Sequence, residues 1–161
     1  MKRRQVFILL LDSYLAAIRG SVGSKMFRHL FASVGGKKQD IAKDGALSCG
    51  IFVSRVLVMF GLVKETHATV EGTLKDMEAS GWKTIRTPRV GAVVVWEPVG
   101  AHRHIGFVVG KGRAISNSTV KHVPVEHSLW KPAHAHGTTR RIESIWWYRK
   151  LSPLRPGGHS G

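Results

Sequence analysis

Residues 49–61, CGIFVSRVLVMFG, form the stretch that decides which fold this sequence predicts. The stretch is apolar nearly all round, and its β-branched residues would suit a buried strand by propensity alone. Its length of about three helical turns and the glycine at its end, Gly61, favour a helix instead. We therefore expect a buried central helix that begins at Cys49.

The segments on either side of this helix carry their own helix signals. The N-terminal run up to Gly20 has the pattern of an amphipathic helix, and Ser24 can cap a short helix through Phe31. Downstream, Thr69 can cap a helix with one apolar face, and Gly81 stands where that helix would end. Helices are thus predicted mainly in the first half of the chain.

Strand signals dominate the second half. Runs rich in β-branched or aromatic residues, separated by glycine and proline, occur at residues 91–96, 104–110, 112–118 and 141–148. An additional pair of short strands is expected around residues 31–43, with a turn at Gly35-Gly36. Helices followed by strands indicate an α+β fold in which the helices pack on an antiparallel sheet.

Length and composition fit one domain. We assign residues 1–150 of the 161 to it, and expect the Pro-, Gly- and Ser-rich residues 151–161 to be disordered. No run approaches the ~20 apolar residues that a membrane span needs. The N-terminal run imitates a signal peptide, but Asp12 interrupts its apolar part. We therefore expect a cytoplasmic protein, or export by another route.

The chain is strongly basic, with 25 Lys and Arg against 10 Asp and Glu, a formal net charge of +15. Such a surface attracts polyanions such as nucleic acid, anionic lipid or anionic wall polymers. The basic residues are scattered and are not interleaved with the aromatic platforms that single-strand binders use. The charge therefore indicates a solvated basic surface rather than a surface that reads nucleic acid.

Cys49 is the one cysteine of the chain, and it lies at the N-terminus of the predicted central helix. Unpaired amides and the helix dipole at such a position can lower a thiol pKa from ~8.5 to ~3.5–7.5. The same amides can hold an oxyanion. The alternative is that Cys49 is a small buried apolar residue without chemistry.

His104 opens the predicted strand 104–110 directly after a polar connection, so its ring can face the start of the helix as the base of a Cys-His pair. A third polar group must then fix the imidazole. The next strand offers Ser116, Asn117 and Ser118. Because an asparagine oxygen can accept the imidazole N–H, chemistry favours Asn117.

The order of these motifs, SCGIFVSRVL, GAVVVWEP, HIGFVVG and AISNS, resembles the papain-like cell-wall cysteine peptidases of the NlpC type. The resemblance covers roughly residues 31–118 and implies a papain-like fold with Cys49 as nucleophile and His104 as base. Its spacing puts the third polar group at Ser116, where the family often has histidine. We favour Asn117, because a bulge that shifts the register costs little at a sheet rim.

Two positions depart from the family pattern. Ser48 stands where the family has aspartate, and Ala32 where it often has tyrosine. Ser48 is therefore the expected substitute donor to the oxyanion or substrate, and Ser116 a second candidate for that role.

The resemblance implies an enzyme that hydrolyses an amide bond of peptidoglycan stem peptides through a thioester, as a monomer and without a cofactor. Contact with an anionic wall polymer would suit the basic surface. Deamidation or acyl transfer on the same scaffold is one alternative. The other is a non-catalytic domain that binds polyanions such as nucleic acid.

Histidines elsewhere in the chain do not form a recognised metal motif. His102 and His104, with His134 and His136, make two H-x-H pairs, but no cysteine or acidic cluster completes a ligand spacing. We therefore expect no metal. His127 is a reserve candidate for lining the cleft.

Overall fold

The computed structural model describes residues 4–130 and 140–153, and in that part of the chain the fold is α+β. The helices are α1 (Leu10–Gly20), α2 (Cys49–Met59), α3 (Val70–Ser80) and a final 3₁₀ turn, η1 (Arg149–Leu151). The strands are β1 (Phe31–Val34), β2 (Lys37–Asp40), β3 (Lys83–Ile85), β4 (Val93–Val99), β5 (His102–Gly110), β6 (Arg113–Asn117), β7 (Pro124–Ser128) and β8 (Ile142–Trp147).

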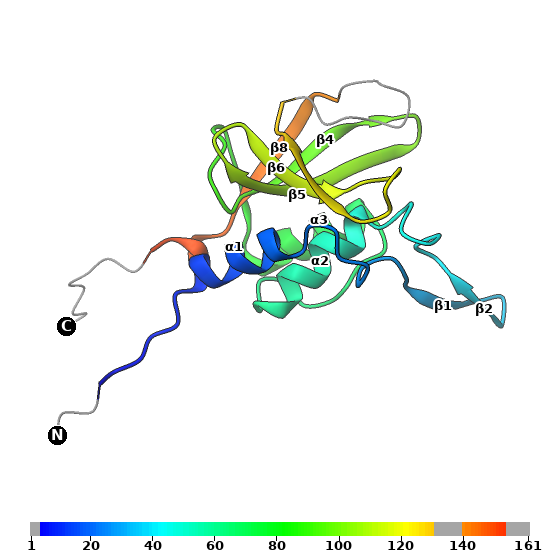
Figure 1. Ribbon diagram of the computed structural model, residues 1–161, viewed down its shortest axis with the longest axis horizontal. Coiled ribbons are helices and arrows are strands. Elements are labelled where there is room, and N and C mark those ends of the chain that lie inside the picture. Colours follow the sequence, from blue (N-terminus) through cyan, green and yellow to red (C-terminus); the bar gives the residue numbers. More distant parts are fainter. Residues whose placement is uncertain (1–3, 131–139, 154–161) are drawn as a thin grey trace.

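Six strands form one antiparallel sheet in the order β3-β8-β4-β5-β6-β7, and the helices gather on one side of it (Figure 1). Strands β1 and β2 form a separate hairpin that projects from the body. The predicted α+β fold with an antiparallel sheet is confirmed. No helix among the described residues is long and apolar enough to cross a membrane.

The central helix α2 is confirmed, and its surroundings explain why it is apolar nearly all round. It contacts α1, α3 and the sheet strands β5 and β6, so most of its faces are covered. Its Phe52 ring packs edge-on against Phe107 of β5, with ring centroids 5.4 Å apart. Gly61 follows the helix at a φ of +64°, a conformation that disfavours other residues.

The helix after Thr69 is confirmed in detail. The Thr69 hydroxyl accepts a hydrogen bond from the Gly72 amide at 3.0 Å, and Gly81 ends the helix with φ of +108°. The first helix also ends as predicted, at Gly20, but it begins only at Leu10. The apolar residues before it, Val6 to Leu9, are exposed, so nothing covers one face of a longer helix.

The short helix predicted from Ser24 to Phe31 is wrong. Residues 25–28 form a turn between irregular backbone at residues 24, 29 and 30, and the Ser24 hydroxyl accepts from the Met26 amide at 3.3 Å. Phe27 is drawn into the core against Phe52, with ring centroids 4.9 Å apart. A short helix is marginally stable unless tertiary packing supports it. The burial of Phe27 therefore stabilises this segment more than a helical turn would.

The domain extends slightly beyond residue 150. Leu151 closes η1 with 1% of its surface exposed, so it belongs to the core rather than to the predicted tail. Of that tail, residues 154–161 lie outside the described part of the chain.

Asp76 of α3 holds the connection between α2 and α3. Its carboxylate accepts from the Lys64 and Glu65 amides, each at 3.0 Å, and lies 2.7 Å from His67 Nε2. Burial alone would raise the pKa of Asp76, but the hydrogen bonds from His67 and from these two amides bring it down to about 2. The carboxylate form is therefore the one that stabilises this loop.

We expect Asp76→Asn to lower the free energy of unfolding by about 2 kcal/mol at pH 7. Because the pKa is depressed in the folded state, the stabilisation is complete above the unfolded pKa of ~4 and disappears as the pH falls towards 2. Denaturant unfolding at pH 7 and at pH 3 measures both effects. Asp12→Asn, at an exposed position of α1, is the control; equal losses in the two variants would contradict the role of Asp76.

Candidate active site

Cys49 is the first residue of α2, where the fold leaves helix amides unpaired. The first helical hydrogen bond runs from the Phe52 amide to the Ser48 carbonyl at 2.8 Å, so the amides of Cys49 and Gly50 have no partner within the helix. The Cys49 side chain is partly buried. It lines a cavity of about 330 Å³ that we call the thiol pocket, which is also lined by His102, His104, Thr119 and Arg140.

The sulfur of Cys49 lies against the backbone of β5 on either side of His104. The thiol points to the Arg103 carbonyl at 4.0 Å, and the Ile105 amide points to the sulfur. Since these two backbone groups flank His104, the fold brings the sulfur and the imidazole to one place. Both side chains line the thiol pocket, as the sequence predicts for a Cys-His pair.

Burial controls the charge of this thiol. Desolvation raises the pKa of Cys49, although the Ile105 and Gly50 amides and the charge of Arg140 act in the opposite direction. The expectation that the helix N-terminus by itself lowers the thiol pKa below its usual range is therefore wrong, because burial outweighs the amides. The resting sulfur carries its proton and needs a base to become a nucleophile.

His104 lines the same pocket as the thiol, and a residue of the neighbouring strand β6 sets the orientation of its imidazole. Its Nε2 lies 2.7 Å from the Ser116 hydroxyl on β6. This contact requires β5 and β6 to approach closely at the pair Gly106 and Ser116. A Cβ on Gly106 would lie 2.6 Å from the Ile115 carbonyl oxygen and 2.7 Å from Ser116 Cβ, so only glycine fits here.

The hydrogen bonds continue to His127 on β7. The Ser116 hydroxyl lies 2.6 Å from His127 Nε2, and His127 Nδ1 lies 2.9 Å from the Ser128 carbonyl. Burial lowers the pKa of His127, so this ring is neutral at neutral pH. His104, Ser116 and His127 come from three adjacent strands and lie on one face of the sheet.

The direction of each hydrogen bond in this relay follows from the carbonyl at its end. A carbonyl only accepts, so His127 Nδ1 carries its proton and the Nε2 of the neutral ring must accept from Ser116. The single hydroxyl proton of Ser116 is then used, so its oxygen accepts from His104 Nε2–H. The relay therefore places the proton of neutral His104 on Nε2 and makes Nδ1 the basic nitrogen.

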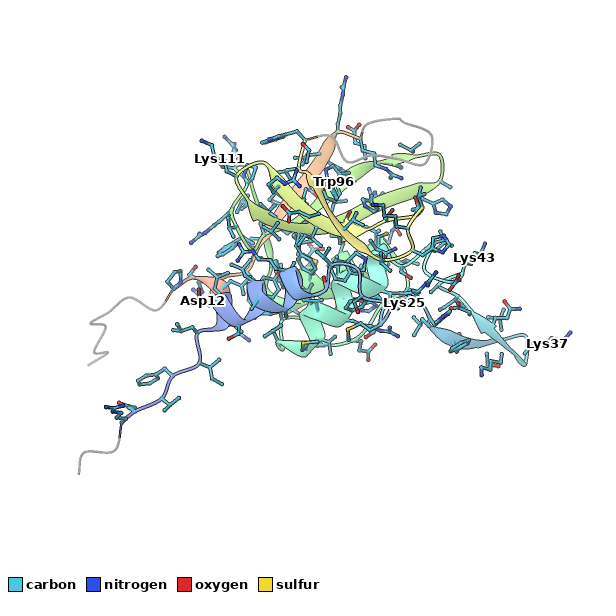
Figure 2. The ribbon with its side chains drawn as sticks, in the orientation of Figure 1. Asp12, Lys25, Lys37, Lys43, Trp96 and Lys111 are labelled. Carbon is cyan, nitrogen blue, oxygen red and sulfur yellow. The ribbon has the colours of Figure 1, made fainter. Side chains whose placement is uncertain are left out.

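Trp96 of β4 supports both imidazoles from beneath. Its ring centroid lies 5.4 Å from that of His104 and 5.5 Å from that of His127, and its Nε1 donates to the Leu129 carbonyl at 3.0 Å. The indole is fully buried and lies within the body of the molecule in Figure 2. It packs against the two rings and is not among the residues that line the thiol pocket.

Asn117, the residue predicted to orient His104, is used elsewhere, and this prediction is corrected. The pairing of β5 with β6 is regular from Gly106 to Val108, so no bulge turns Asn117 towards His104. Its Nδ2 donates to the Gly45 carbonyl at 2.7 Å, in the loop before α2, and its buried Oδ1 has no hydrogen-bond partner among the described residues. Asn117 anchors that loop, whereas Ser116 contacts the imidazole.

Ser48 does not reach a substrate either. Its side chain is fully buried, its hydroxyl makes no hydrogen bond within residues 4–130 and 140–153, and it is not among the residues that line the thiol pocket. Ala32 lies on β1 of the projecting hairpin. The donors nearest to the sulfur are instead the backbone amides of Ile105, Gly50 and Cys49, which can serve an oxyanion as well as a thiolate.

A second cavity of about 280 Å³ lies beside the thiol pocket. We call it the relay pocket, because it is lined by His104, Ser116 and His127, together with Thr119, Lys121 and Arg140. His104, Thr119 and Arg140 line both pockets, so the imidazole stands at their junction.

Among the described residues no group of three or more His, Cys, Asp or Glu side chains is arranged to hold a metal ion. His134 and His136 of the second H-x-H pair lie outside the described residues. No family model matches the chain, and no curated protein matches its sequence.

Proposed function

We propose that this protein is a papain-like cysteine hydrolase that cleaves an amide bond through a thioester intermediate, with Cys49 as nucleophile and His104 as base. The observation that carries the proposal is the relay from His104 through Ser116 to His127. The relay keeps the imidazole proton of His104 on Nε2, so that Nδ1 is the basic nitrogen, and His104 lines the same cavity as the thiol. A buried structural cysteine needs no such arrangement beside it.

The reaction follows from these positions. His104 Nδ1 takes the thiol proton, and the sulfur attacks the carbonyl carbon of the amide to form a tetrahedral oxyanion. The amides near the sulfur stabilise that oxyanion. The imidazolium then gives its proton to the leaving amine, the C–N bond breaks, and water hydrolyses the thioester with His104 again as base.

The substrate class in this proposal comes from the resemblance to NlpC-type peptidases, which implies an amide bond in a peptidoglycan stem peptide. The net charge of +15 supports it, because a basic surface draws the enzyme to an anionic wall polymer. Deamidation and acyl transfer use the same residues, and mass analysis of the products separates the three reactions. Cleavage gives two peptides whose masses together exceed that of the substrate by one water, deamidation releases ammonia, and acyl transfer joins the acyl group to another amine.

The pH dependence of Cys49 alkylation by iodoacetamide tests the Cys-His pair without a substrate. In the wild type we expect the rate to be high already at neutral pH, because His104 removes the thiol proton. In His104→Ala the rate at neutral pH should fall and the rate should increase only in the alkaline range, since burial raises the thiol pKa. Superimposable profiles would sink the proposal.

His102→Ala is the matched control, since His102 also lines the thiol pocket but is exposed. Its profile should coincide with that of the wild type. A shift as large as that of His104→Ala would mean that general electrostatics, rather than one base, control the thiol.

A non-catalytic polyanion-binding domain is the second candidate, and the +15 charge is the observation that favours it. Of the exposed lysines labelled in Figure 2, Lys25, Lys37 and Lys43 lie towards the β1–β2 hairpin, whereas Lys111 lies on the opposite side of the molecule. This candidate requires nucleic-acid binding that weakens steeply with salt, together with a thiol whose alkylation ignores His104.

A further inference from the structure

Arg140 is a buried cation without a carboxylate partner. Only 6% of its surface is exposed, and no ion pair within the described part of the chain includes it. All ten Asp and Glu residues of the sequence lie in that part. Burying an unpaired charge is costly, so a side chain in this state calls for a specific reason.

Within the described part of the chain, the hydrogen bonds of Arg140 involve one of its nitrogens, Nη1. Its Nη1 donates to the Glu97 carbonyl at 3.2 Å and to the His102 carbonyl at 2.5 Å, which ties the end of β4 to the start of β5. Carbonyl dipoles hold the guanidinium in place but do not neutralise it. The charge of Arg140 acts on Cys49, where it favours the thiolate and so opposes the rise of the thiol pKa that burial causes.

Other arginines near the two pockets have acidic partners. Glu71, which lines the thiol pocket, lies 3.8 Å from Arg103, and Arg103 also pairs with Glu143 at 2.7 Å. Glu126, which lines the relay pocket, pairs with Arg113 at 2.9 Å. Arg140 lines both pockets, and its positive charge is available to an anion that binds in them.

From this we infer that Arg140 forms an anion-binding subsite in the thiol pocket, which takes a carboxylate of the substrate close to the bond that is cleaved. A guanidinium suits this role, because its planar fork can engage both oxygens of a carboxylate. The inference rests on the proposed function. It adds that the preferred substrate is an acidic peptide whose free carboxylate lies beside the scissile amide.

Two alkylating agents of nearly equal size test the subsite without a substrate. Iodoacetate carries a carboxylate, whereas iodoacetamide is neutral; with either, the thiolate attacks the CH₂ carbon, the S–C bond forms and iodide leaves. Both react with the same thiolate, so the ratio of their rate constants does not depend on how much thiolate is present. The ratio therefore reports the charge that the reagent meets beside Cys49.

We expect the iodoacetate-to-iodoacetamide ratio for Cys49 to be about tenfold higher than for 2-mercaptoethanol at low ionic strength. Arg140→Gln should remove most of this preference, and Arg140→Lys should keep most of it. Arg141→Gln makes the same change of charge at the exposed neighbouring residue and should leave the ratio unchanged.

A wild-type ratio no higher than that of 2-mercaptoethanol overturns the inference, and this measurement needs no variant to fold. An elevated ratio that persists in folded Arg140→Gln also overturns it, since the charge would then come from His104 or from the surface as a whole. If the ratio behaves as expected but the alkylation profile ignores His104, the anion subsite stands and the catalytic proposal fails. If the alkylation profile depends on His104 but the ratio does not depend on Arg140, the catalytic proposal stands and the anion subsite fails.

Discussion

Replacing Cys49 with alanine is expected to abolish the release of stem peptides from purified peptidoglycan, with a fall of at least about 10⁴-fold in rate. The magnitude follows from the loss of the nucleophile, since a catalytic group that acts within a unit carries most of the rate enhancement of that unit. Cys49 is the one cysteine of the chain, so no other thiol can replace it. Mass spectrometry of the soluble products measures the rate.

Folding must be separated from chemistry in this experiment. Cys49 is partly buried and packs against the core, so the alanine variant should unfold at a slightly lower temperature but remain folded under assay conditions. Equal digestion by the variant and the wild type would place the chemistry away from Cys49. A wild type that digests nothing, yet shows the His104-dependent alkylation profile, would retain the Cys-His pair and exclude this substrate.

Ser116→Ala is expected to reduce the turnover rate by about 10²-fold or more while leaving the fold intact. Without the hydroxyl, His104 Nε2 loses this acceptor and His127 loses its donor, so the relay no longer favours the tautomer with the proton on Nε2. A base held in the wrong tautomer fails even when its position is unchanged. Steady-state kinetics should show the loss mainly in kcat, and the His104-dependent alkylation at neutral pH should weaken in parallel.

Asn117→Ala is the matched comparison for that variant, since the two residues are neighbours on β6 but face opposite sides of the sheet. The asparagine variant removes the anchor on the Gly45 carbonyl, so it should lower thermal stability. Its alkylation profile should keep the wild-type shape. If Asn117→Ala changes the pH profile and Ser116→Ala does not, the orienting role belongs to Asn117 after all.

Helices were predictable from this sequence where cap and core signals agree. Thr69 and Gly81 bracket α3, and the apolar run after Cys49 gives α2, because both helices are covered by the rest of the protein. Ser24 is a good cap residue, but no helix follows it, because Phe27 packs in the core against Phe52. A local sequence pattern does not show this contact between distant residues.

The candidate site was predictable only in part. Cys49 and His104 carry local signals, namely a helix start and a strand start. The choice between Ser116 and Asn117 depends on which of them faces Gly106 across the sheet, and pairing register is not written in either strand alone. His127 was only a reserve candidate, because its strand β7 begins with Pro124 and contains polar residues, so no strand pattern announced it.

The edge-on contact between Phe52 of α2 and Phe107 of β5 joins the two elements that carry Cys49 and His104. Cys49 begins α2 and His104 lies near the start of β5, so the packing of these two rings helps to set the distance between the helix and the sheet at the proposed Cys-His pair. The packing of these two rings therefore bears on the reactivity of Cys49. A smaller or larger side chain at either position is therefore expected to change the separation of sulfur and imidazole, and with it the rate of Cys49 alkylation, without altering a polar atom.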